Sequence, residues 1–261
     1  MAWGYKYHNN WLDNAVKEIK SSYGHIVAIR PKSLHKFGRA TSLGTSETEI
    51  NSINQNETYV ATNAIDTLSC SSADNTHLVY VEGMTISDGV ISFEAQTATL
   101  NGQSKVTLDT PLYRVTRMEN RGSAILDGDV YAYEDTAITG GVPDDLSKVH
   151  NQIIAADGQS LRAGTTIASN NYFIVTRLRA SVNKKTSAFA DIKFKVRGYD
   201  QTFLTKQVFT LSTSAQPFVE IAAEPHFIIP PRTDIYVTAT CSTTGVDVSA
   251  GFDGYFADIS G

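Results

Sequence analysis

The sequence has little of what secreted, membrane-spanning and disulfide-stabilised proteins are built from. Its 261 residues include two cysteines and seven prolines, and only 19% are charged. No apolar run approaches the roughly 20 residues that a transmembrane helix needs, and the first residues lack the apolar stretch of a secretion signal. Cys70 and Cys241 lie far apart, which favours two buried free thiols over a disulfide. We expect a protein that does not use the usual secretion route and has no membrane partner.

The residue patterns of catalytic and metal sites are missing as well. The six histidines are scattered singly, whereas a zinc site needs three or four converging ligands. The acidic stretch from Asp127 to Asp135 departs from calcium-loop spacing after its second aspartate, which favours a solvated turn. No nucleophile elbow and no phosphate-binding glycine loop occur. We therefore expect no catalytic residues, no metal, no cofactor and no enzymatic activity.

The sequence is instead rich in strand-forming residues arranged with a two-residue period. Ile192, Phe194 and Val196 alternate with charged residues, and Val246, Val248, Ala250 and Phe252 repeat this pattern near the end. Alternate side chains of a strand point to opposite faces, so each segment predicts a strand with one buried and one solvated face. The pattern predicts an all-β fold.

Turn-rich segments divide the chain into three expected parts. Residues 1–45 are predicted to be an N-terminal arm with one short amphipathic helix, and residues 32–46 read as a linker rich in Gly, Ser and Thr. Residues 46–138 hold seven short strand patterns, the size of an immunoglobulin-like sandwich. Residues 139–261 hold eight, which predicts a jelly-roll-like sandwich. We thus expect two consecutive antiparallel β-sandwiches.

Charge is distributed unevenly along these parts. Residues 1–39 carry 7 Lys and Arg against 2 Asp and Glu (+5), residues 40–146 carry 4 against 16 (−12), and residues 147–261 carry 11 against 9 (+2). The basic arm could lie on the acidic part of its own chain or of a neighbouring copy, or dock on another acidic protein. No dense basic run is present, so nucleic acid is not an expected partner.

The arm combines aromatic and basic residues. Trp11, Ala15 and Ile19 recur at four-residue spacing, which predicts a helix that stops near Gly24. A disordered tail is usually poor in aromatic residues, so we expect the arm to be ordered against a surface. The residues predicted to anchor it on a partner are Trp3, Tyr5, Tyr7, Trp11, Lys17, Lys20, Arg30 and Lys36. Removing residues 1–39 should then leave both sandwiches folded.

A second candidate contact is a basic patch on the C-terminal sandwich. Five basic residues fall at outward positions of two successive predicted strands, and they would form one patch if those strands pair. They are Arg177, Arg179, Lys193, Lys195 and Arg197. Such a patch could contact the acidic part of a neighbouring subunit, or it could be an ordinary solvated sheet face.

Several segments resemble a family of virion proteins of tailed bacteriophages from marine and other environments. The resemblance is carried by K-K-T-S-A-F-A-D-I-K-F-K-V-R at 184–197, by S-A-G-F-D at 249–253 and by the stretch 99–120, and it covers roughly residues 45–261. It implies a non-enzymatic structural protein of the virion, assembled in the host cytoplasm. The implied partners are the major capsid protein or other virion proteins, in a homo-oligomer for which a trimer is one option.

Three functions follow as hypotheses. The first is a capsid decoration, or cement, protein that stabilises the head through protein–protein contacts. The second is a tail adaptor or fibre component. The third comes from another class, a carbohydrate-binding module that recognises host-surface glycans through Tyr131, Tyr133, Tyr199 and Tyr255.

Overall fold

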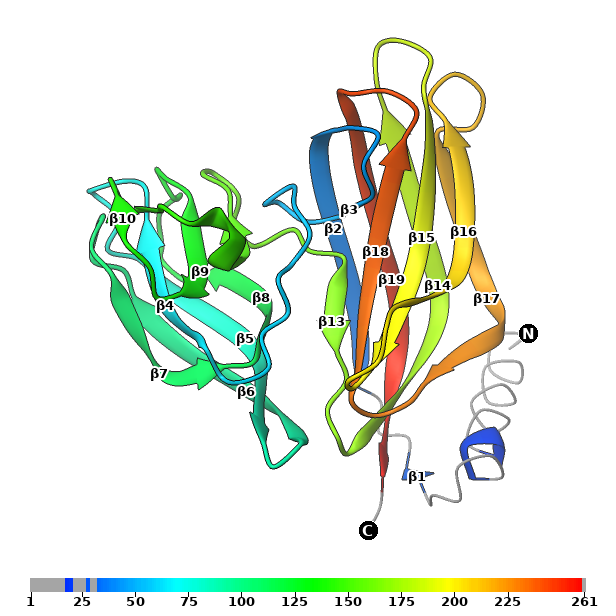
Figure 1. The fold of residues 1–261 in the computed structure, drawn as a ribbon, viewed down its shortest axis with the longest axis horizontal. Coiled ribbons are helices and arrows are strands. Elements are labelled where there is room, and N and C mark those ends of the chain that lie inside the picture. The colour runs from blue at the N-terminus through cyan, green and yellow to red at the C-terminus, as the bar shows by residue number, and fades with distance from the viewer. Residues whose placement is uncertain (1–16, 21–26, 29–31, 260–261) are drawn as a thin grey trace, which may run out of the picture.

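The computed structural model describes residues 17–20, 27–28 and 32–259, except for the side chains of residues 27–28 and 224–226. The described chain is nearly all β and forms two sandwiches that lie side by side (Figure 1). The all-β class predicted from the two-residue period is therefore confirmed.

The larger sandwich consists of two antiparallel sheets. The first sheet, sheet A, has the order β2-β19-β14-β17, with β1 beside the end of β19; the second, sheet B, has the order β13-β18-β15-β16, with β3 also beside β18. The strands are β1 (Val27–Ala28), β2 (Ser33–Leu43), β3 (Thr48–Glu49), β13 (Gly164–Thr166), β14 (Asn171–Asn183), β15 (Phe189–Gly198), β16 (Leu204–Ser212), β17 (Phe218–Ile229), β18 (Thr233–Cys241) and β19 (Val246–Ile259). From β13 onward every connection except the β15–β16 hairpin crosses from one sheet to the other, which gives the double-sheet jelly roll expected from the sequence.

The smaller sandwich packs a four-stranded sheet, β12-β9-β4-β7, against a three-stranded sheet, β6-β5-β8. Its strands are β4 (Ile65–Cys70), β5 (Leu78–Ser87), β6 (Val90–Thr99), β7 (Val106–Leu112), β8 (Arg114–Asn120), β9 (Val130–Glu134) and β12 (Val149–Ile153); the hairpin β10 (Ile138–Thr139) and β11 (Val142–Pro143) and a 3₁₀ turn (Leu146–Lys148) precede β12. Seven strands in two sheets match the immunoglobulin-like expectation in size. The strand order differs, because β4 pairs with β9 and β7 rather than with the next strand.

The two sandwiches do not follow one another along the chain, as the sequence had predicted. The smaller sandwich is inserted between β3 and β13, which both pair with β18 of the jelly roll. The linker predicted over residues 32–46 is wrong, because β2 pairs with β19 from Ser33 to Leu43. The boundary expected at residue 138 is displaced, because β12 pairs with β9. The jelly roll is thus assembled from both ends of the described chain.

The core positions follow the predicted alternation. Ile192, Phe194 and Val196 are buried in the jelly-roll core together with Val246 and Phe252. Cys241 lies in this core and Cys70 in the core of the smaller sandwich, and both are free thiols. The burial of apolar residues on one face of each strand accounts for the two separate cores.

Residues 17–20 are helical and pack on the outside of sheet A. The Ile19 side chain is fully buried in a small cluster with Tyr172, Ile174 and Ala257, whereas Lys17 and Lys20 are exposed. The buried side of this helical turn therefore lies on the jelly roll of its own chain.

Replacing Ile19 by Ala should release this turn from sheet A. Loss of a buried isoleucine side chain from such a cluster costs about 2–5 kcal/mol, while the jelly-roll core is untouched. Limited trypsin digestion should cleave after Lys17 or Lys20 several-fold faster in Ile19→Ala than in wild type. The variant Ile125→Ala, at an exposed position of the smaller sandwich, is the control. Equal cleavage of all three proteins would contradict the packing.

Candidate functional site

The arm residues fall into three groups. Trp3, Tyr5, Tyr7, Trp11 and Arg30 lie outside the described residues, and Lys17 and Lys20 are exposed on the helical turn. Lys36 was expected to meet an acidic partner, and this prediction is wrong. It is only 7% exposed and donates a hydrogen bond of 2.5 Å from Nζ to the Thr116 carbonyl of the smaller sandwich. Because β2 begins at Ser33, removing residues 1–39 would also remove most of a paired strand.

The single basic patch expected on the jelly roll is also wrong. Strands β14 and β15 belong to opposite sheets, so Arg177 and Arg179 lie on one outer face and the other three residues on the other. Both groups are neutralised within the chain. Arg177 pairs with Glu220 at 3.2 Å and Arg179 with Asp253 at 3.1 Å, while Lys193 and Lys195 both reach Glu47 at 2.6 Å. Arg197 pairs with Asp234 at 2.5 Å.

A buried ionic cluster joins the outer face of sheet B to the smaller sandwich and to the segment that links them. Its centre is Glu57, whose carboxylate pairs with the Arg162 guanidinium and accepts a hydrogen bond of 2.6 Å from the Tyr236 hydroxyl. His150 of β12 lies between two carboxylates, with Nδ1 3.1 Å from Glu57 Oε1 and Nε2 3.1 Å from Glu134 Oε1. These side chains come from β9, β12, β18 and two connecting segments, so the cluster joins the two sandwiches to each other.

A second group of charges continues the same contact. Asp234 of β18 pairs with Arg114 of the smaller sandwich at 3.5 Å and accepts a hydrogen bond of 2.6 Å from Thr166. The Arg114 guanidinium lies over the Tyr113 ring at 3.7 Å and donates to the Val60 carbonyl at 3.0 Å. Separating such buried charges from their partners is strongly unfavourable, because each would be left without its counter-charge. The domain junction is therefore a defined ionic contact.

Burial and neighbouring charges shift the ionisation of this cluster. Burial would raise the pKa of Glu57, but Arg162 and His150 more than offset it and hold the pKa well below its usual range. Burial raises the pKa of Glu49 to about 7, and the nearby Glu57 carboxylate adds to this. Burial also lowers the pKa of Lys36 to about 7, assisted by the positive charge of Arg162. At neutral pH, Glu49 and Lys36 are therefore each close to the midpoint between their charged and neutral forms.

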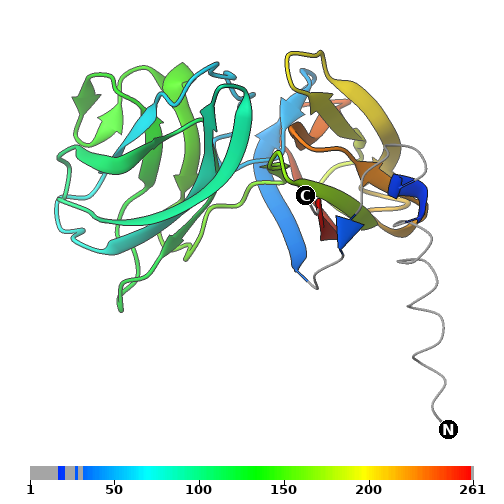
Figure 2. The same cartoon turned by 90° about the horizontal axis from the view of Figure 1, so that it is seen from below.

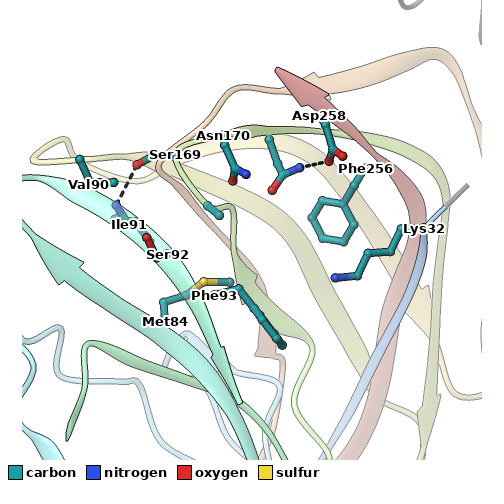
Figure 3. Close-up of a pocket in the computed structure, with 12 residues that line it drawn as sticks. Lys32, Met84, Val90, Ile91, Ser92, Phe93, Ser169, Asn170, Phe256 and Asp258 are labelled. Atoms are coloured by element: carbon teal, nitrogen blue, oxygen red, sulfur yellow. Dashed lines mark hydrogen bonds between the residues drawn. The ribbon is translucent and has the colours of Figure 1, made fainter. Parts of the chain in front are cut away.

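An open groove of about 690 Å³ lies where the tip of the smaller sandwich meets the ends of β14 and β19. Figure 3 shows residues of β6 on one side, including Ile91 and Phe93, and Phe256 of β19 on the other. Lys32 projects between them, with Nζ 5.1 Å from the Phe93 ring centre and 5.8 Å from the Phe256 ring centre. A hydrogen bond of 2.8 Å from the Ile91 amide to Ser169 Oγ ties the two walls together. The groove is a partly apolar surface that continues directly from the domain junction.

The side of the jelly roll farthest from the smaller sandwich has a different character (Figure 1). Strands β16 and β17 are the edges of their sheets there, and no further described strand pairs with either of them. Leu204 and Val208 on β16, Phe218 on β17 and Phe189 on β15 are each roughly half exposed. Unpaired edges that carry large apolar side chains tend to be covered by another chain. Figure 2 shows the same separation of this side from the smaller sandwich.

The tyrosines proposed for glycan stacking are poorly placed for it. Tyr131 and Tyr133 are buried in the smaller sandwich, so their rings cannot stack on a sugar. The Tyr199 ring already lies 4.0 Å from the Arg232 guanidinium. The stacking prediction is therefore wrong for Tyr131 and Tyr133, whereas it stays a prediction for Tyr255 of β19, which is half-buried.

Within the described ranges no group of three or more histidine, cysteine or acidic side chains could hold a metal ion. No helix among those ranges is long and apolar enough to cross a membrane.

No family model matches the sequence, and no curated protein matches it. Among solved structures, the infectious bursal disease virus Gt strain aligns at 12% identity over 90% of this chain and 72% of the viral chain, with a TM-score of 0.21. The VP2 subviral particle of the same virus aligns at 10% identity over 94% and 77%, with a TM-score of 0.21. A Bacillus thuringiensis Cry1Da tryptic core variant aligns at 6% identity over 82% and 52%, with a TM-score of 0.20. Scores this low do not establish a relationship, so the fold assignment rests on the strand pairings above.

Proposed function

We propose that this chain is a non-enzymatic structural component of a bacteriophage virion, and specifically a capsid decoration protein that acts through protein–protein contacts. The observation that carries the proposal is the edge formed by β16 and β17, with which no further described strand pairs and which has exposed apolar side chains on both strands. A jelly roll with such an edge suits repeated assembly. Of the segments that resemble phage virion proteins, 184–197 covers the loop before β15 and most of β15, and 249–253 lies in β19.

The rigid junction supports the same role. Ionic contacts from Glu57, Arg162 and Asp234 fix the smaller sandwich against the jelly roll, so a contact made by one sandwich positions the other. A subunit that bridges neighbours on a particle needs a fixed geometry of this kind, because a mobile domain would lose entropy on assembly. The partners of this chain are then other virion proteins or further copies of itself.

Charging the apolar edge should prevent incorporation into particles. The double variant Leu204→Glu, Val208→Glu should keep its fold, because both wild-type side chains are exposed. A partner that covers this edge would have to bury two carboxylates, which is strongly unfavourable. We expect at least a tenfold loss of the protein from purified particles, measured by quantitative mass spectrometry, with an unchanged melting temperature. Ile125→Glu, at an exposed apolar position of the smaller sandwich, is the matched control.

Undiminished incorporation of the folded double variant would sink the proposed edge contact. The same mass spectrometry distinguishes decoration from a tail part, because a decoration protein is present in numbers comparable to the capsid protein. A tail adaptor or fibre is present in a handful of copies on each particle.

A further inference from the structure

The outer face of sheet A carries a row of residues that are large at its ends and small in its middle. In order across the four paired strands, the row consists of Arg39 of β2, Ser249 of β19, Ser181 of β14 and Phe218 of β17. Paired residues of neighbouring strands share a face, and Ala250, next to Ser249, lies in the core. The row therefore points outward, and its surface is lowest at the two serines.

The next row extends this low surface, because Gly251 pairs with Phe37 on one side and with Arg179 on the other. A Cβ at Gly251 would collide with the backbone of β2, so this position stays without a side chain. Together the rows line the sheet A hollow, an open space of about 250 Å³. Phe37 is 42% exposed and Phe218 54% exposed. At about 30 Å³ for each water molecule, the space corresponds to about eight waters, enough for one large side chain.

Two arginines line the sheet A hollow, and no acidic side chain of the described residues does. The Arg39 side chain is 53% exposed and contacts Asp247 through one nitrogen at 3.3 Å. The Arg179 side chain is 31% exposed and contacts Asp253 through one nitrogen at 3.1 Å. A guanidinium has five N–H donors, so each arginine can bind a further carboxylate. The hollow therefore suits an apolar side chain that has carboxylates beside it.

The smaller sandwich presents this combination at the 3₁₀ turn before β12. Leu146 is 51% exposed, and the two residues before it, Asp144 and Asp145, are exposed as well. The turn is held in place because Asp145 accepts a hydrogen bond of 3.0 Å from the Ser147 amide and Gln55 donates one of 2.6 Å to the Leu146 carbonyl. This turn does not line the hollow of its own chain, so the two surfaces can meet only between copies.

We propose that Leu146 of one copy inserts into the sheet A hollow of a second copy. The carboxylates of Asp144 and Asp145 then lie next to the two arginines of the hollow, and the acidic stretch 40–146 favours the approach of the two copies. Because the two surfaces differ, the contact is heterologous and repeats from copy to copy, closing into a ring or continuing as a chain. It does not depend on what binds the edge formed by β16 and β17.

The test is analytical ultracentrifugation of the full chain from about 1 µM to about 1 mM, in which wild type should associate beyond the monomer. Leu146→Arg brings a cation to the arginines of the hollow, and Arg39→Glu brings a carboxylate to the two aspartates. Each should weaken association by about tenfold or more, with melting temperatures recorded to confirm folding. An equimolar mixture of the two variants should associate again, because the intact turn of one meets the intact hollow of the other.

Matched controls make the same changes away from both surfaces. Ile125→Arg alters an exposed apolar residue, and Arg121→Glu alters an arginine whose side chain is 53% exposed, as that of Arg39 is; both should associate like wild type. A monomeric wild type throughout this range overturns the proposal, and so does a mixture that associates no better than its components. Folded Leu146→Arg and Arg39→Glu that associate as tightly as wild type overturn it too.

The variant Leu204→Glu, Val208→Glu separates this contact from the proposed function. It leaves the turn and the hollow unchanged, so it should associate with itself like wild type even where its incorporation into particles is lost. Loss of self-association in this variant would assign the contact between copies to the edge formed by β16 and β17 and would overturn the role of the hollow.

Discussion

Replacing Arg162 by Met should destabilise the protein by about 3–5 kcal/mol, because the Glu57 carboxylate would remain buried without its strongest counter-charge. The Arg162 guanidinium also donates to the Tyr236 hydroxyl at 2.5 Å and to the His150 carbonyl, so three buried acceptors lose a donor together. Urea unfolding at pH 7 measures the change as a lowered midpoint.

Two further variants isolate the cause of this loss. Adding Glu57→Gln to Arg162→Met removes both charges, and the double variant should recover part of the stability. Arg177→Met breaks a surface pair with Glu220 in which both side chains are largely exposed, and should change stability by about 0.5 kcal/mol or less. An Arg162→Met protein within about 1 kcal/mol of wild type would contradict the role assigned to the junction.

Replacing Lys36 by Met should stabilise the protein in a manner that depends on pH. The pKa of Lys36 falls from 10.5 in the unfolded chain to about 7 in the folded protein. Between these values the unfolded chain binds the extra proton, so wild-type stability rises with pH from 7 to 10.5, and below pH 7 the full penalty applies. The advantage of Lys36→Met should therefore decrease by about 4 kcal/mol between pH 6 and pH 10.

The charges that face Lys36 belong to several elements, and all remain in the variant. Arg162 and Arg117 oppose its protonation, while Glu82 of β5 favours it. Parallel urea titrations at pH 6, 8 and 10 give the difference between the two proteins. The exposed Lys20→Met is the control and should show no change with pH; a Lys36→Met difference that is constant across this range would disprove the explanation.

Strands whose inward side faces a core could be predicted from the sequence. In β15, Ile192, Phe194 and Val196 point into the core as the alternation indicates. The sequence predicted a linker where β2 lies, because part of the inward side of this strand, at Lys36, contacts the smaller sandwich and not an apolar core. There Lys36 is buried at 7% exposure and its neighbour Phe37 is 42% exposed, which inverts the usual pattern. Burial by another domain leaves no periodic apolar signal in the strand itself.

The partners within the junction could not be predicted for a related reason. Glu57 lies 105 residues from Arg162 and 179 from Tyr236, and nothing local in the sequence marks such pairs. The basic patch failed because it assumed that successive strands pair, whereas a jelly roll places β14 and β15 in different sheets. The position of the edge formed by β16 and β17, with which no other described strand pairs, likewise depends on the topology of the whole sandwich and not on any one segment.

The pairing of β2 with β19 also orders the events of folding during synthesis. His35 and Asp253 meet across these strands although they are 218 residues apart in sequence, so β2 leaves the ribosome long before its partner exists. The smaller sandwich has all seven of its strands by Ile153 and can fold while the jelly roll is still incomplete. Closure of the jelly roll is then the late and slow step, since it joins the most distant parts of the described chain. Until β19 is made, β2 is an open strand edge, and this nascent stage is the one at which the chain most needs protection from aggregation.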